Sequence, residues 1–391
     1  MGFSKIPQER IQSESVGRTA SVVTALLLFF CVISVAFYAY QKSLDPSISI
    51  KDVLQKFQVT GNNAAKEAKV QYSFDFDSGE KPVFAIFGDY LVKSSSNGIW
   101  FLDKKGGVVR SESIAFNNPM IKTNGSQLLA ADIGTGEIWV FVDKTVRWRD
   151  KLDSSIMNAD ISVDGYVTVI TASKRDNNEV RVYEPHGVEL FRKIIANDFA
   201  ISAGVAPSKN MLAVSVISTG VAGAYSNYKF YDLEGNALAE QAFDISGDML
   251  PIFWYNNDGS LFAAGDRALA SLDKAGKVIW EKQFKSVAGA ARAGNKRLVA
   301  VIENNESRRV VLYNTAGQEL SSASLQGKPR GLAAIKGAIA VNTYDTVYFY
   351  NEKCKKISTY SAGSQIRQVH LYDKQQAAVI TDNKITIINI M

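Results

Sequence analysis

The chain has 391 residues, of which 46% are hydrophobic and 21% charged, and its formal net charge is +5. This composition is ordinary for a globular protein with one membrane segment. The positive charge is too weak to indicate nucleic acid or anionic lipid as the main partner. Only two cysteines are present, Cys31 and Cys354, so the sequence has neither a disulfide framework nor paired cysteines for a metal site.

The first predicted element is a transmembrane helix that begins at Thr19 and ends at Tyr40. Its 22 residues carry no charge and lie between Arg18 and Lys42. As a helix they would extend about 33 Å, which is enough to cross a bilayer. We expect an uncleaved anchor, with residues 1–18 as a cytoplasmic tail and the larger C-terminal part outside the cell, although flanking positive charges are nearly balanced. A signal peptide cleaved after small residues near the end of this segment is the alternative.

Residues 41–67 are predicted to form a stalk between the membrane and a folded domain. Four apolar residues recur there at helical spacing, namely Ile50, Val53, Leu54 and Phe57. This spacing indicates a short helix, with a helix that lies on the membrane or on a partner as the alternative. Residues 60–66 (TGNNAAK) have the composition of a flexible joint.

From residue 68 to the C-terminus the sequence repeats. Eight apolar strands each end in an acidic or amide residue that begins a tight turn, at intervals of 37 to 48 residues: Asp103, Asp143, Glu184, Asp232, Asp273, Asn314, Asn351 and Asn389. Five of these turns have Gly three positions later, where a hairpin turn needs a positive φ. Two further apolar runs precede each such strand. A period of roughly 40 residues with four short strands predicts the blades of a β-propeller.

The predicted fold class is therefore all-β, an eight-bladed propeller over residues 68–391, with seven blades or an irregular sandwich as alternatives. The last unit ends at residue 391 without room for an outer strand. The alternating segment 68–76 (AKVQYSFDF) is expected to supply that strand and close the ring, because closure removes an open sheet edge. Two turns depart from the pattern: the turn at Asp143 lacks Gly, and Cys354 stands where Gly is expected, which would strain that turn or change its type.

Four segments resemble one known family: residues 87–91 (FGDYL), 115–141, 158–171 and 207–220. This family contains uncharacterised proteins of Gram-positive bacteria with an N-terminal membrane anchor and a propeller-like domain. The resemblance covers most of residues 70–280 and implies topology and fold, and it supplies no catalytic residues. Residues 272–280 (LDKAGKVIW) are similar to the repeat of quinoprotein-like and WD40-like propellers, with Trp148 as a partial second match. This wider similarity implies blade architecture and not quinone binding.

No catalytic constellation is evident in the sequence. The two histidines, His186 and His370, lie in a turn and in an inner strand, and no nucleophile elbow accompanies them. The turn carboxylates occur once per unit, so we expect no metal site and no cofactor. The alternative is an anchored enzyme or small-ligand sensor that gathers polar residues of the inner strands at the central channel, namely Asn118, Asn158 and Asp160.

Binding is expected on one face of the propeller. Loops that join blades, and loops that join second to third strands, share this face, and rigidly held loops concentrate binding residues. Residues 218–227 are predicted to form the longest loop, and residues 173–179 and 303–309 charged ones. Candidate binding residues are Tyr225, Tyr228, Asn177, Arg175, Asn305 and Arg308. The expected function is a non-catalytic, membrane-anchored propeller that holds a protein or cell-envelope partner as a scaffold or assembly factor.

Overall fold

The computed structural model describes residues 35–36, 38–40, 42–43, 66–172, 178–207, 210–220, 223–243, 248–304 and 307–391. Within these ranges, no helix is long and apolar enough to cross a membrane. The predicted transmembrane helix and stalk lie almost entirely outside the described residues. The account below concerns the compact unit within Ala65–Leu325 and Pro329–Met391.

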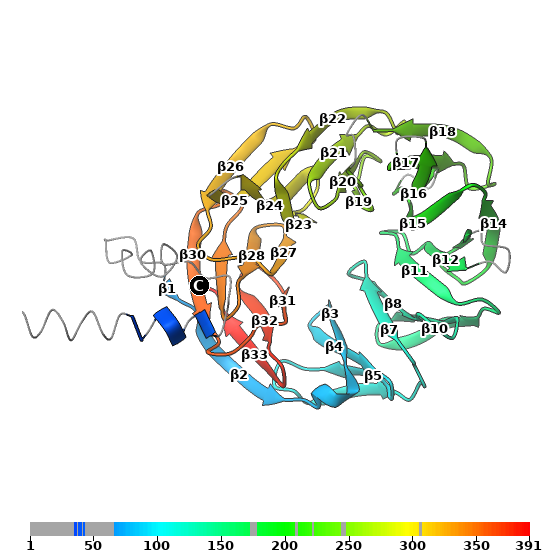
Figure 1. Ribbon diagram of the computed structural model, residues 1–391. Helices are drawn as coiled ribbons and strands as arrows, with labels where there is room; N and C mark the ends of the chain where they lie inside the picture. Colours follow the sequence, from blue (N-terminus) through cyan, green and yellow to red (C-terminus); the bar gives the residue numbers. More distant parts are fainter. Residues whose placement is uncertain are drawn as a thin grey trace, which may run out of the picture. The chain divides into compact units, whose positions relative to one another are not determined.

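Eight sheets follow one another in chain order around a common centre (Figure 1), and each is a blade. Blade 1 contains β3 (Val83–Phe87), β4 (Tyr90–Ser95), β5 (Gly98–Leu102) and β6 (Val108–Glu112). Blade 2 contains β7 (Pro119–Thr123), β8 (Gln127–Asp132), β9 (Glu137–Val142) and β10 (Thr145–Lys151). Blade 3 contains β11 (Ile156–Ile161), β12 (Val167–Ala172), β13 (Asn178–Tyr183) and β14 (Glu189–Ile195). Blade 4 contains β15 (Asp198–Val205), β16 (Leu212–Gly220), β17 (Gly223–Tyr231) and β18 (Ala237–Ala242).

The second half of the ring has the same organisation. Blade 5 contains β19 (Ile252–Tyr255), β20 (Leu261–Ala264), β21 (Ala268–Leu272) and β22 (Val278–Gln283). Blade 6 contains β23 (Ser286–Arg292), β24 (Arg297–Asn304), β25 (Ser307–Asn314) and β26 (Glu319–Ser324). Blade 7 contains β27 (Gly331–Ile335), β28 (Ala338–Asn342), β29 (Thr346–Tyr350), β30 (Lys356–Ser361) and the short β1 (Lys66–Glu67). Blade 8 contains β31 (Gln368–Leu371), β32 (Gln376–Ile380), β33 (Lys384–Asn389) and β2 (Lys69–Asp75), and the 3₁₀ helix η1 (Ser78–Glu80) follows β2.

The prediction of eight blades closed by an N-terminal strand is confirmed. β2 pairs antiparallel with β33, and Val70 lies opposite Ile388. The sequence did not predict β1, which pairs parallel with β30 at the outer edge of blade 7. Ala68, between β1 and β2, is buried, and its N–H donates to the carbonyl of Thr359 at 2.8 Å. Two consecutive short strands therefore join blades 7 and 8.

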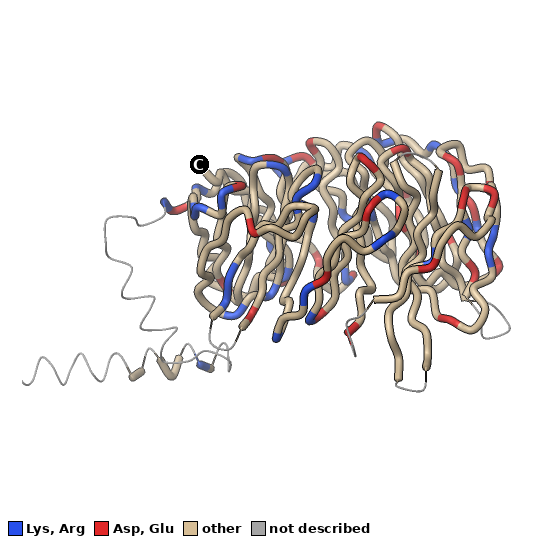
Figure 2. Tube along the Cα trace, turned by 90° about the horizontal axis from the view of Figure 1, so that it is seen from above, with Lys and Arg blue, Asp and Glu red and all other residues tan. Residues whose placement is uncertain are grey.

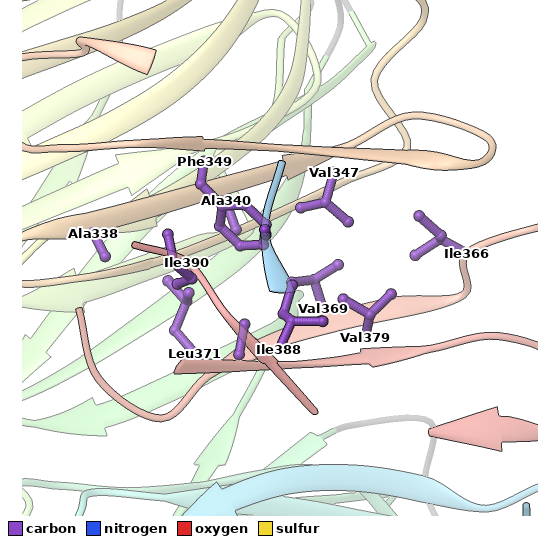
Figure 3. Close-up of a cluster of buried hydrophobic side chains, with 12 residues drawn as sticks. Ala338, Ala340, Val347, Phe349, Ile366, Val369, Leu371, Val379, Ile388 and Ile390 are labelled. Carbon is purple, nitrogen blue, oxygen red and sulfur yellow. The ribbon is translucent and has the colours of Figure 1, made fainter. Parts of the chain in front are cut away.

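Apolar side chains fill the space between each pair of neighbouring blades. The second and third strands of a blade are buried on both faces, as in β28 and β32, whose Ala, Val and Ile side chains contact one neighbour or the other. Figure 3 shows the cluster between blades 7 and 8, to which Phe349 of blade 7 and Ile388 of blade 8 both belong. Each large apolar side chain buried in this way stabilises the fold by roughly 1.5–3 kcal/mol. A matching cluster joins blade 8 to blade 1, so the ring is closed by packing as well as by pairing.

The repeated turn between the third and outer strands has the predicted chemistry. In blade 1 the Asp103 carboxylate accepts hydrogen bonds from the N–H groups of Lys105 and Gly107, both at 2.8 Å. The same pair of bonds forms at Asp232, Asp273, Asn314 and Asn351. Five turns have Gly three positions after the acidic or amide residue, and the φ of that glycine lies between 77° and 90°. We call these five hairpins, which begin at Asp103, Glu184, Asp232, Asp273 and Asn314, the Asx–Gly turns, and the name includes the one that begins with Glu.

An aromatic ring from the preceding blade packs on the glycine of several of these turns. A Cβ atom on Gly317 would lie 2.8 Å from Cγ of Trp280, and the Trp280 indole N–H donates to the Thr315 carbonyl at 2.9 Å. Outer-strand rings lie in the same way on three other turn glycines: Phe74 on Gly106, Trp148 on Gly187, and Phe191 on Gly235. In four of the eight blades, an outer-strand tryptophan or phenylalanine therefore packs on the turn of the next blade.

The turns that begin at Asp143 and Asn351 lack the glycine, and each reaches a positive φ in a different way. Asp143 and Lys144 both have positive φ, 46° and 67°, and form a two-residue turn that needs no glycine. Cys354 has a φ of 51° and keeps the turn, with its N–H donating to the Asn351 carbonyl at 3.0 Å. Its buried Sγ accepts from the Ser321 hydroxyl at 3.3 Å. Ser321 occupies the same position of the outer strand as Trp280 in the preceding blade. The small Ser321 side chain therefore stands where the turn of the next blade has Cys354 instead of glycine.

We expect Gly317→Ala to lower the free energy of unfolding more than Gly363→Ala does. Both glycines have positive φ, 77° and 68°, but a Cβ atom on Gly363 meets nothing within 4 Å. Gly363→Ala is the control, and backbone strain alone should lower its free energy of unfolding by about 1–2 kcal/mol. Gly317→Ala should cost about 1–3 kcal/mol more, because the Trp280 ring must move. Urea unfolding followed by tryptophan fluorescence measures both, and equal losses would show that the ring is not fixed on the turn.

Candidate functional site

The two faces of the propeller carry different connections. On one face, which we call the loop face, each outer strand leads to the next blade and each second strand turns into the third. The Asx–Gly turns lie at the opposite ends of these strands, on the turn face, because neighbouring strands in a blade are antiparallel. Figure 2 shows charged residues of both signs spread along the ring, without a large patch of one sign.

Blade 4 has a hairpin that projects from the loop face. β16 and β17 have nine residues each and pair without interruption from Leu212 opposite Tyr231 to Gly220 opposite Gly223. The prediction of a loop over residues 218–227 is therefore wrong, because residues 218–220 pair with residues 223–225 and continue the ladder between β16 and β17. Figure 2 shows this hairpin as a long projection, and its described residues beyond β15 and β18 include no Lys, Arg, Asp or Glu. Residues 221–222 lie outside the described residues.

The candidate binding residues do not form one site. Tyr225 lies on the projecting hairpin with 39% of its surface exposed. Tyr228 is fully buried and donates to the Leu250 carbonyl at 2.7 Å, so it belongs to the core between blades 4 and 5, and this burial raises the pKa of its hydroxyl. Arg308 lies in blade 6, with Nε 3.0 Å from a carboxylate oxygen of Glu303. The other three fall outside the part of the chain that the structure describes: Arg175, Asn177 and Asn305.

Exposed apolar side chains that the sequence analysis did not single out surround the base of the hairpin. Phe199, Met249 and Ile252 are 45%, 36% and 52% exposed. Phe199 lies opposite Ile217, which lies opposite Ser226, and the Ser226 hydroxyl accepts from the Leu250 N–H at 2.9 Å. These contacts connect β15, through β16 and β17, to Leu250, the residue that follows Met249. We call Phe199, Ile217, Met249 and Ile252 the blade-four patch. Tyr225, opposite Ser218 on β17, points to the other side of the hairpin.

The central channel is the second place where functional groups gather. Asn158 and Asp160 of β11, both expected there, line a cavity of about 330 Å³ together with Lys122 of β7 and Phe253 of β19. A cavity of about 220 Å³ shares Asp160 and Phe253 and reaches Arg292 of β23. The third expected channel residue, Asn118, precedes β7, and its N–H donates to the buried Asp132 carboxylate at 2.7 Å.

Two titratable groups of the inner strands, Asp160 of β11 and His370 of β31, have pKa values shifted by their surroundings. Asp160 opens to the cavity, but the protein around it desolvates the carboxylate and raises its pKa to about 6, partly offset by the charge of Lys122. His370 lies in β31, with Nε2 2.9 Å from the side-chain oxygen of Gln368. Burial lowers the pKa of His370 to about 4, so the ring is neutral at pH 7. Within the described ranges, no group of three or more His, Cys, Asp or Glu could hold a metal ion.

The fold is similar to several solved propellers at low sequence identity. BamB from Moraxella catarrhalis has 14% identity and a TM-score of 0.54, with 82% of this chain and 99% of that chain covered. The C-terminal WD40 domain of Sif2 has 11% identity and a TM-score of 0.61, with 84% and 99% covered. Sqt1 from Saccharomyces cerevisiae has 12% identity and a TM-score of 0.54, with 82% and 98% covered. These likenesses show a shared fold, and no shared site follows from them.

The sequence comparison with known families gives one match. No curated protein matches the sequence. The model of a family of unknown function, DUF5711, matches residues 61–390. This range takes in every blade, from the N-terminal strands that close the ring to the last residues of blade 8. The protein therefore belongs to the DUF5711 family of unknown function.

Proposed function

We propose that the protein is a non-catalytic, membrane-anchored propeller that binds a protein partner on its loop face, as a scaffold or assembly factor in the cell envelope. The observation that carries this proposal is the blade-four patch. Phe199, Met249 and Ile252 are each more than a third exposed around one projecting hairpin. Apolar side chains grouped on a surface favour association, because a partner removes them from water.

The hairpin gives the partner a way to bind through its backbone. The first residue of β15, Asp198, pairs with Ser218, so Thr219 and Gly220 continue beyond β15. On the other edge, β18 ends at Ala242, which pairs with Asn227, and residues 223–226 continue beyond β18. Among the described strands none covers these two edges. Open edges accept an added strand, so the best occupant is an extended segment of another protein, with the apolar side chains of the patch beneath it.

The membrane anchor remains part of the proposal. It rests on the uncharged residues 19–40 between Arg18 and Lys42, which are long enough to cross a bilayer. With residues 1–18 inside the cell, the propeller would face the envelope. The blade-four patch would then be available to proteins or wall-associated molecules outside the membrane.

We expect a photo-crosslinking amino acid at Tyr225 to form one discrete protein adduct in living cells. The same probe at Val188, which is 57% exposed after the Asx–Gly turn of blade 3, is the matched control and should form none. Phe199→Asp should reduce the Tyr225 adduct at least tenfold, because a charge in the patch opposes apolar burial. Val188→Asp should leave it unchanged. Equal adducts from both probes, or an adduct insensitive to Phe199→Asp, would contradict the proposed surface.

We expect a cysteine at Val163 to react with a membrane-impermeant maleimide on intact cells. Val163 is 50% exposed on the turn face, whereas the native Cys354 is 3% exposed and should stay unlabelled. A cysteine at Ser4, in the expected tail, should react only after the cells are broken. Labelling of Val163→Cys in broken cells alone would place the propeller in the cytoplasm and contradict the proposed topology.

A further inference from the structure

We propose that the central channel binds a free α-amino acid with an apolar side chain, held by Asp160, Lys122, Arg292 and the aromatic side chains of β19. This site lies in the channel and shares only Ile252 of β19 with the blade-four patch, so it adds a ligand to the proposed partner. The two cavities that form it share Asp160, Phe253 and Trp254 and lie among β7, β11, β15, β19 and β23.

Asp160 supplies the recognition of an ammonium group. Its carboxylate opens into both cavities, and among the described residues no ion pair neutralises it. Gly204 keeps the space in front of it open, since a Cβ atom there would lie 3.7 Å from Oδ2 of Asp160 and 3.3 Å from Cε2 of Phe253. Desolvation, only partly offset by the charge of Lys122, raises the pKa of this carboxyl. An ammonium group in direct contact would provide a closer opposite charge.

Two cations supply the recognition of a carboxylate. Lys122 lines the larger cavity and Arg292 the smaller one. One guanidinium nitrogen of Arg292 donates to the Tyr255 carbonyl at 2.8 Å, which fixes the side chain at the cavity wall. A guanidinium has five N–H donors, so others remain for a ligand carboxylate. A ligand with only positive charge would be repelled by these cations, and one with only negative charge by Asp160.

The apolar part of the ligand would contact the rings of β19. Phe253 is held in place by Tyr228 and Tyr255, with ring centroids 5.6 Å and 5.7 Å away. Trp254 follows it on the same strand and lines both cavities. The larger cavity, about 330 Å³, is at the lower end of the range for small-molecule sites. These walls and this volume fit a single amino acid better than a longer peptide.

Calorimetric titration of the full-length chain, purified in detergent, with L-leucine and L-phenylalanine tests the site. We expect at least one of the two to bind. N-acetyl-L-leucine lacks the ammonium group and L-leucinamide lacks the carboxylate, and the same pair of derivatives of phenylalanine is available. Each derivative should bind at least tenfold more weakly than its parent amino acid. Absence of binding at millimolar concentration, or equal binding of a derivative, would overturn the proposal, whichever proteins the blade-four patch contacts.

Variants separate the site from adventitious binding. Asp160→Asn keeps the size of the side chain and should weaken binding at least tenfold. Glu234→Gln, in the exposed turn after β17 and absent from both cavity walls, should leave binding unchanged. Thermal unfolding checks that both variants fold, and the derivative series on the native chain does not depend on them. Unchanged binding by a folded Asp160→Asn variant would overturn the role of the carboxylate.

Discussion

Each blade of this propeller can bury its apolar strands only against its two neighbours, so every interface depends on the ring being closed. The second and third strands are buried on both faces, and the apolar clusters lie between blades rather than within them. A single four-stranded blade would leave both of its apolar faces in water. The closing strands β1 and β2, and the aromatic rings on the turn glycines, therefore stabilise the whole ring and not only the blades that contain them.

The fold could be predicted largely because residues close together in the sequence specify its turns and strands. An Asx residue followed by Gly specifies a turn through hydrogen bonds within five residues. Eight acidic or amide residues at the ends of apolar strands predicted the number of blades. The closing strand was predictable because the last unit lacked an outer strand and residues 68–76 alternate. β1 was not predictable, since two residues carry no pattern and only the edge of β30 defines them. The hairpin over residues 218–227 was mistaken for a loop, because its Gly and Ser residues suggested a connection.

The candidate sites were less predictable, because burial and proximity come from the ring. Tyr225 and Tyr228 look alike in the sequence, but they are three residues apart on one strand and so point to opposite sides of it, one exposed and the other in the core. Asp160 and Asn158 could be expected at the channel from their inner strand. No spacing relates Asp160 to Phe253 or Arg292, which come from three different blades and meet only because the blades surround one centre.

The closure of blade 8 also determines when the protein can finish folding. Ser73 of β2 and Ile385 of β33 are neighbours in the sheet but are 312 residues apart in the chain. During synthesis β2 is made long before its partner strand β33. The growing chain therefore carries an unpaired β2 until β33 has been made, and such edges are prone to wrong pairing. Loss of β33 would leave β2 without its partner and the ring open.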